Sequence, residues 1–163
     1  MSIQILLHIS VVMILSPLLL GIIAKTKAFF AGRWGPPLLQ PYYDIRKLFR
    51  KGNVYSITTT WIFQAAPIVF MATALLSSIL IPLGSLKAPL QFWGDIILFA
   101  YLYGLARFFM LIAALDTGSS FEGLGASREA AFSCLAEAAL FLDFIVLALL
   151  SKNFVLSEMI GGN

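Results

Sequence analysis

Long apolar runs dominate the chain, and polar residues lie mainly between them. Residues 3–24 and 57–83 contain no Asp, Glu, Lys or Arg, and residues 96–115 contain only Arg107. A helix that crosses a lipid bilayer needs about 20 predominantly apolar residues. The three runs therefore predict membrane-spanning helices, and Pro67 is expected to kink the second of them.

A fourth spanning helix is predicted over residues 127–150, where the sequence becomes steadily more apolar. Ser127 is a suitable N-cap residue, the run is apolar from Ala138 onward, and Asp143 is the acidic residue within it. The expected fold is all-α: one polytopic membrane domain over residues 1–163, with four transmembrane helices.

The connector between the first two runs has its own helical pattern. Within residues 38–51 the apolar positions 38, 42, 45 and 49 share one side of a helix, with 48 beside them, and charged residues occupy the other side. Gly35-Pro36-Pro37 cannot continue a helix, Pro41 suits the first turn of a new one, and Gly52 is a natural stop. The pattern predicts an amphipathic helix at a membrane surface.

Two interpretations of this amphipathic helix stay open. It is either an anchor whose cations meet anionic lipid headgroups or a docking surface for a cytoplasmic partner. The rigid turn before it favours docking, because a lipid anchor needs no fixed entry angle.

The composition excludes an ordinary soluble domain. The chain is 60% hydrophobic and 12% charged, with a mean hydropathy of +0.93, whereas soluble domains are about 45–50% apolar and about 25% charged. The single Cys134 and the single His8 have no neighbours at metal-ligand spacing. We therefore expect no disulfide, metal site, cofactor or nucleic-acid site in this chain.

The lysine and arginine distribution predicts the orientation in the membrane. Residues 84–95 carry one basic residue, Lys87, whereas the connector over residues 25–56 carries one acid, Asp44, and seven basic residues: Lys25, Lys27, Arg33, Arg46, Lys47, Arg50 and Lys51. Basic residues in short loops favour the cytoplasmic side. The connector is therefore predicted to be cytoplasmic, in a multi-pass protein of the cytoplasmic (inner) membrane with both termini outside.

Charged residues within the spans are candidates for an ion path. Arg107 lies near mid-membrane, where a charge costs about 2.5–3.5 kcal/mol on insertion scales, so it needs a partner or a wet cavity. Glu137 and Asp143 are the candidate partners, and each could serve packing alone or take part in ion movement. Arg128 and Glu129, near the expected start of the fourth helix, could form a local ion pair or stabilise the helix end.

Two long motifs carry a family resemblance. Residues 32–51 read GRWGPPLLQPYYDIRKLFRK, and residues 114–140 read ALDTGSSFEGLGASREAAFSCLAEAAL. Both resemble the signature segments of the H-type membrane subunit shared by respiratory complex I and energy-converting membrane-bound nickel–iron hydrogenases, including formate hydrogenlyase. Complex I members have an insertion between the GRxGP and LLQP elements, so the direct GPPLLQP junction is similar to the hydrogenase branch.

The resemblance implies a non-catalytic subunit that anchors a cytoplasmic redox module and couples electron transfer to proton or sodium translocation. It implies an acidic channel near the second motif, and the ion-path candidates are Glu137, Glu129, Arg128, Arg107, Asp143 and Asp116. It also implies a docking platform at the first motif, formed by Arg33, Pro36, Pro37, Gln40, Asp44, Arg46, Lys47, Arg50 and Lys51. The alternatives are a subunit of a complex I-like quinone oxidoreductase and a purely structural membrane anchor.

The resemblance also implies partners and cofactors outside this chain. The partners would be the large and small (iron–sulfur) hydrogenase subunits and antiporter-like membrane subunits, and the nickel–iron centre and iron–sulfur clusters would lie in them. Family members have about eight membrane helices. They usually read LAEP where residues 135–138 of this chain read LAEA. We therefore expect a second chain to supply the other helices, and a straighter fourth helix.

Overall fold

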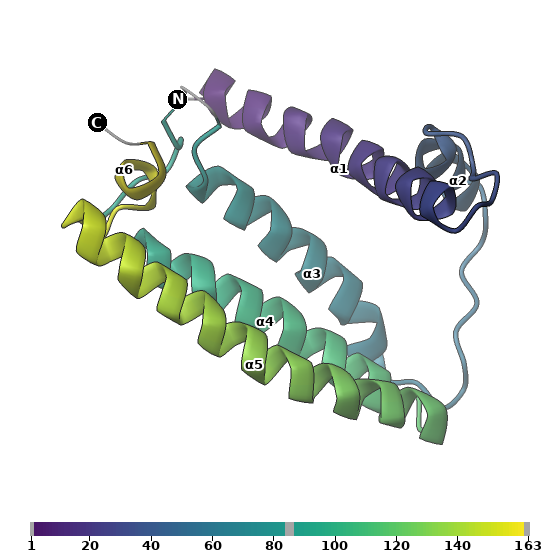
Figure 1. Cartoon of the computed structure of the whole chain (residues 1–163). Helices are drawn as coiled ribbons and strands as arrows, with labels where there is room; N and C mark the ends of the chain where they lie inside the picture. The colour runs from purple at the N-terminus through teal and green to yellow at the C-terminus, as the bar shows by residue number, and fades with distance from the viewer. Residues whose placement is uncertain (1, 84–86, 162–163) are drawn as a thin grey trace. The chain divides into compact units, whose positions relative to one another are not determined.

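The computed structural model describes residues 2–83 and 87–161, and the elements it contains are helices (Figure 1). They are α1 (Ser2–Phe30), α2 (Gln40–Leu48), α3 (Trp61–Leu80), α4 (Asp95–Asp116), α5 (Ser120–Ser151) and α6 (Leu156–Gly161). Four candidate membrane spans are present among the described residues: Gln4–Phe30, Trp61–Leu80, Asp95–Asp116 and Ser120–Ser151. The all-α prediction and the prediction of four spanning helices are confirmed.

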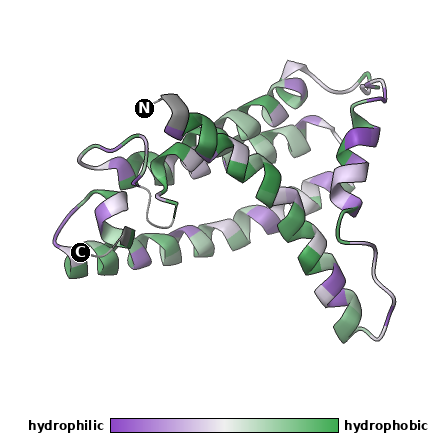
Figure 2. Ribbon diagram, turned by 90° about the horizontal axis from the view of Figure 1, so that it is seen from above, coloured by the Kyte–Doolittle hydropathy of each residue, from purple (hydrophilic) through white to green (hydrophobic). Residues whose placement is uncertain are grey.

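The long helices are hydrophobic around most of their circumference (Figure 2). Large apolar side chains such as Phe30 on α1 and Leu149 on α5 are 84% and 73% exposed. A soluble protein rarely exposes apolar surface on this scale. These surfaces face lipid or other membrane helices, so the protein is membrane-embedded.

Residues 2–54 form one compact unit, built from α1 and α2. α1 ends where Gly32 adopts a left-handed conformation (φ 64°) and the Arg33 amide donates to the Ala28 carbonyl at 2.9 Å. The chain then turns back along α1, and the Leu38 carbonyl passes so close to Gly21 that a Cβ there would lie 2.1 Å from its oxygen. The Tyr42 hydroxyl also donates to the Ile14 carbonyl. The GPP turn therefore brings α2 back against α1.

The unit that begins at residue 55 contains α3 to α6. α3 packs along α4, and α4 packs along α5 (Figure 1). Asp116, the last residue of α4, joins it to the start of α3: its carboxylate accepts the Thr60 amide at 2.7 Å and the Thr60 hydroxyl at 2.8 Å. Thr60 is the N-cap of α3. An anion is favourable at a helix N-terminus, so this contact fixes the antiparallel pairing of α3 and α4.

The other end of α4 is joined to α6. Asp95, the first residue of α4, is fully buried, and its Oδ1 accepts the Leu156 amide at 2.8 Å. The Gly94 amide donates to the Phe154 carbonyl at 3.2 Å, and the rings of Trp93 and Phe154 meet edge to face. These contacts form a clasp that closes the end of the α4–α5 pair.

One predicted helix start was wrong. The fourth spanning helix begins at Ser120, not at Ser127. The turn between α4 and α5 lies at Gly118, which has a left-handed conformation (φ 69°), and Ser119 is therefore the N-cap residue. Gly123 and Gly125 lie within α5 although glycine has a low helix propensity. Glu129 is therefore well inside the helix, where the positive charge of the helix end no longer acts on it.

Other boundaries differ by a turn or so. The first helix continues past residue 24 to Phe30, since Lys25 and Lys27 are good helix formers. The second spanning helix starts at Trp61 because Thr60 caps it, and the amphipathic helix covers only Gln40–Leu48 of the predicted 38–51. Pro41 does lie in its first turn, as predicted.

The clasp at Asp95 leads to a stability prediction. Asp95→Ala leaves the buried Leu156 amide without an acceptor, so we expect the free energy of unfolding to fall by about 1–3 kcal/mol. Asp95→Asn keeps an oxygen acceptor and should lose less. Denaturant titration in lipid micelles, followed by circular dichroism, measures both. The exposed Glu129→Ala is the control, and equal losses for the two Asp95 variants would contradict the role of this hydrogen bond.

Candidate functional site

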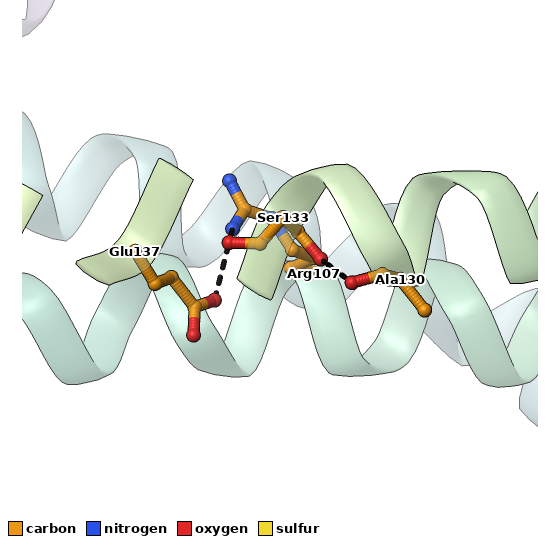
Figure 3. A network of polar contacts seen from close by, with 4 residues as sticks. All are labelled: Arg107, Ala130, Ser133 and Glu137. Atoms are coloured by element: carbon orange, nitrogen blue, oxygen red, sulfur yellow. Dashed lines mark hydrogen bonds and ion pairs between the residues drawn. The ribbon is translucent and has the colours of Figure 1, made fainter. Parts of the chain in front are cut away.

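α4 and α5 meet at an ion pair. The Arg107 guanidinium on α4 lies 2.9 Å from the Glu137 carboxylate on α5, from Nη1 to Oε1 (Figure 3). The same nitrogen also donates to the Ser133 carbonyl at 3.3 Å. Of the two partners that the sequence offered for Arg107, the structure brings Glu137 into contact.

Ser133 forms part of the surface of α5 that the guanidinium contacts. It lies one turn before Glu137 on α5, and its buried hydroxyl donates to the Ala130 carbonyl at 3.0 Å. Its side chain is therefore satisfied within its own helix, and its small volume lets α4 approach closely enough for Arg107 to reach the backbone. Figure 3 shows the guanidinium beside Ser133, with a dashed line joining it to the Glu137 carboxylate.

The pair lies in the middle of both spans. Arg107 is about 18 Å from the start of α4 and about 14 Å from its end, at 1.5 Å per residue. Glu137 is similarly distant from both ends of α5, since it is about 26 Å from Ser120 and about 21 Å from Ser151. A single charge at this depth is unfavourable, so two opposite charges in contact lower the free energy of both helices in the bilayer.

The pair borders an open cleft between α4 and α5 with a volume of about 370 Å³. The side chains of Arg107 and Glu137 keep 27% and 46% of their surface exposed. The cleft has small residues and aromatic residues around the charges: Ala100, Gly104 and Ala136, with Tyr101, Tyr103 and Phe141. The Glu137 Oε2 atom has no hydrogen-bond partner among the described residues, so the carboxylate can accept a further donor or a proton.

The other predicted ion-path residues lie apart from this pair. Arg128, Glu129 and Asp143 are exposed on α5, and none has an ion pair within the described part of the chain. The local ion pair considered for Arg128 and Glu129 is thus not formed among these residues. Asp116 is engaged at the start of α3, about 14 Å along α4 from Arg107.

The predicted docking residues lie on and around α2. Gln40 is half-buried and donates to Asp44 at 3.0 Å. The other members of the set are exposed: Arg33, Pro36, Pro37, Asp44, Arg46, Lys47, Arg50 and Lys51. The apolar side of this helix lies against α1 at its start, where Tyr42 is half-buried, whereas Leu48 and the next residue, Phe49, are 63% and 87% exposed. The charged side and the end of the amphipathic helix are therefore exposed to lipid or to another protein.

Sequence reasoning did not single out Ser133, Thr60 or Asp95. The available signal for Ser133 was its spacing of seven residues from Ala126, which puts two small residues on one side of α5; the structure buries both. In the parts of the chain that the structure describes, no three His, Cys, Asp or Glu side chains are grouped so that they could hold a metal ion. What the arrangement offers chemically is a Glu137 carboxylate with one oxygen open to a further donor, beside the positive charge of Arg107.

A double-mutant cycle tests the pair directly. We expect Arg107→Ala and Glu137→Ala to be coupled by about 0.6–1.7 kcal/mol in unfolding experiments in detergent micelles, between the average and the maximum found by double-mutant cycles for interhelical hydrogen bonds in a membrane protein. The adjacent but unpaired Arg128 and Glu129 provide the matched control, with a coupling near zero. Additive losses at Arg107 and Glu137 would contradict the contact.

Residues 3–162 match the NADH dehydrogenase family. The chain is 38% identical to hydrogenase-4 component C of Escherichia coli over 88% of its own length and 45% of the relative's. It is also 38% identical to formate hydrogenlyase subunit 4 of Escherichia coli, over 88% of this chain and 47% of the relative. A subunit of the membrane-bound sulfane sulfur reductase, an archaeal respiratory membrane complex, superposes with a TM-score of 0.81 at 31% identity, covering 96% of this chain and 51% of that one.

The match to the family extends over nearly the whole chain, although the chain spans only about half the length of these relatives. The two motifs, the four spanning helices and the superposition agree with it. The chain therefore belongs to the NADH dehydrogenase family, as the resemblance to its H-type membrane subunits predicted.

Proposed function

We propose that this chain is a non-catalytic membrane subunit of a multi-subunit energy-converting hydrogenase. It anchors a cytoplasmic redox module and helps to couple electron transfer to proton or sodium movement. The observation that carries the proposal is the Arg107–Glu137 pair at mid-membrane, beside an open cleft. The 38% identity to hydrogenase-4 component C and formate hydrogenlyase subunit 4 supports the hydrogenase branch.

The proposed coupling is electrostatic. When Glu137 binds a proton or a cation, its negative charge no longer balances Arg107, and the guanidinium is left with the Ser133 carbonyl alone. In a medium of low dielectric constant, such a change of charge alters the energy of neighbouring ionisable groups. Conversely, a redox change in an adjoining subunit would alter the charge near the pair and so change how readily Glu137 binds a proton or a cation. The hydrogen chemistry would take place at the nickel–iron centre of the large subunit, supplied with electrons by iron–sulfur clusters.

The proposed docking surface is α2 with the turn before it. Its cations would meet acidic faces of the hydrogenase subunits, and the GPP turn with its contact at Gly21 would hold the helix at a fixed angle to α1. This part of the proposal includes a cytoplasmic location for the connector over residues 25–56, which follows from the charge distribution.

A complex I-like quinone oxidoreductase is the second candidate function, and the family match over residues 3–162 favours it. The direct GPPLLQP junction weighs against it, because the resemblance places an insertion there in complex I members. Quinone-dependent turnover by the intact complex would decide for this second candidate.

The central test is Glu137→Gln in the intact membrane complex. The amide cannot exchange a proton, so we expect ion-gradient formation to fall by about 100-fold or more, the lower range for a positioned acid–base group. Assembly and hydrogen turnover with an artificial electron acceptor should persist. The matched control is Glu122→Gln, the same change on the same helix at an exposed position that is not among the ion-path candidates. Unchanged ion movement in Glu137→Gln would leave the chain as a purely structural anchor.

Charge reversal tests the docking surface. Arg46→Glu combined with Lys47→Glu should weaken retention of the redox subunits roughly tenfold, taking about 0.7 kcal/mol for each reversed exposed charge. The difference should shrink at about 1 M salt, where the screening length is about 3 Å. Lys87→Glu, exposed and predicted to lie on the other side of the membrane, is the control. Equal retention in all variants would favour the lipid-anchor interpretation.

A further inference from the structure

The Arg107–Glu137 pair is incompletely covered within its own unit. Glu137 keeps 46% of its side-chain surface exposed, and its Oε2 atom lacks a hydrogen-bond partner among the described residues. Lipid acyl chains cannot donate a hydrogen bond, and an unsatisfied polar group in hydrocarbon costs several kcal/mol. Something that carries a donor must therefore cover this position in the assembled membrane.

The shape of the cleft fits a third helix. Two adjacent turns of α4 present Ala100 and Gly104, and α5 presents Ala136 opposite them. Small residues on both helices allow another helix backbone to approach closely. Larger aromatic side chains, Tyr103 and Phe141, stand beside this floor and provide walls.

The charge of the site restricts the side chain that the third helix offers. Arg107 and Glu137 already balance each other at 2.9 Å, so a further full charge would be uncompensated at mid-membrane. A neutral donor, such as a hydroxyl, an amide or an indole N–H, satisfies Oε2 without this penalty.

The length of the relatives indicates where such a helix comes from. This chain accounts for 45–51% of the relatives and of the solved structure that it matches, so as much polypeptide again belongs to the family fold.

We propose that the cleft between α4 and α5 seats a membrane-spanning helix from the part of the family fold that this chain does not span, and that this helix donates a neutral hydrogen bond to Glu137. The inference names the partner of the site on which the proposed function rests. It makes the ion-exchanging carboxylate a buried group of the complete assembly.

Site-specific cross-linking tests the occupant. In a Cys134→Ser background, Ala136→Cys is labelled with a short photoactivatable reagent in native membranes that contain the intact complex. After irradiation, mass spectrometry should find the label joined to a membrane-spanning peptide of a polypeptide segment that aligns with the relatives' remaining half. Ala138→Cys, exposed on α5 but outside the cleft lining, is the matched control and should not give this product.

Labels joined only to lipid, to a second copy of this chain, to α1, or to a segment that does not span the membrane would each overturn the proposal. A second measurement fills the cleft: Gly104→Leu should weaken association with the cross-linked segment by about 5- to 150-fold, the effect of an overpacking penalty of ordinary size. Ala138→Leu should leave the association unchanged. Equal association in both variants would also overturn the proposal.

These results are independent of those for the proposed function. A cross-link to the complementary segment together with normal ion movement in Glu137→Gln would refute ion coupling and keep the seat for the helix. The opposite combination, with no spanning helix in the cleft and ion movement lost in Glu137→Gln, would refute the seat and keep the coupling.

Discussion

The absence of hydrogen-bonding partners in hydrocarbon is the constraint on which the rest of this structure depends. Several hydroxyl side chains within the spans are satisfied by carbonyls of their own helix. On α3, the hydroxyl of Thr73 donates to the Val69 carbonyl and that of Ser77 to the Thr73 carbonyl, and Ser133 does the same on α5. The Arg107 side chain is long and carries a full positive charge, so a carbonyl of its own helix does not balance it. It reaches a second helix, and so it determines how α4 and α5 are placed against each other.

α4 is the central element for the same reason. Its two terminal carboxylates each accept a backbone amide of another element: Asp116 accepts from Thr60 at the start of α3, and Asp95 from Leu156 at the start of α6. Between them, Arg107 holds α5. Three acidic or basic side chains on one helix thus organise three neighbours, with few large apolar residues buried inside the unit. A bundle built in this way keeps much of its apolar surface for lipid and for other helices.

The sequence predicted the spanning helices because apolar runs of this length have one stable solution in a bilayer. It did not predict the start of α5, since Ser119 and Ser127 are both good caps and only the left-handed turn at Gly118 selects the first. The sequence also offered two candidate partners for Arg107 and did not decide between them. Glu137 and Asp143 are six residues apart, so they lie on different sides of a helix, and the rotation of α5 decides between them. That rotation depends on packing at Ala126 and Ser133, which only the tertiary structure fixes.

The spacing of the ionisable groups argues for an ion path that several chains or segments complete. Direct proton transfer needs heavy atoms within about 2.6–3.2 Å, or one water between them. Arginine stays protonated in proteins, so of the Arg107–Glu137 pair only Glu137 could exchange a proton. Asp116 lies about 14 Å farther along α4. Asp116 also has both oxygens engaged by Thr60. In the proposed mechanism this chain would contribute one charge-balanced station at mid-membrane, and the neighbouring stations would come from water and from the helix proposed to cover the cleft. That helix would then control whether Glu137 exchanges its proton or cation, so coupling would be a property of the assembled complex.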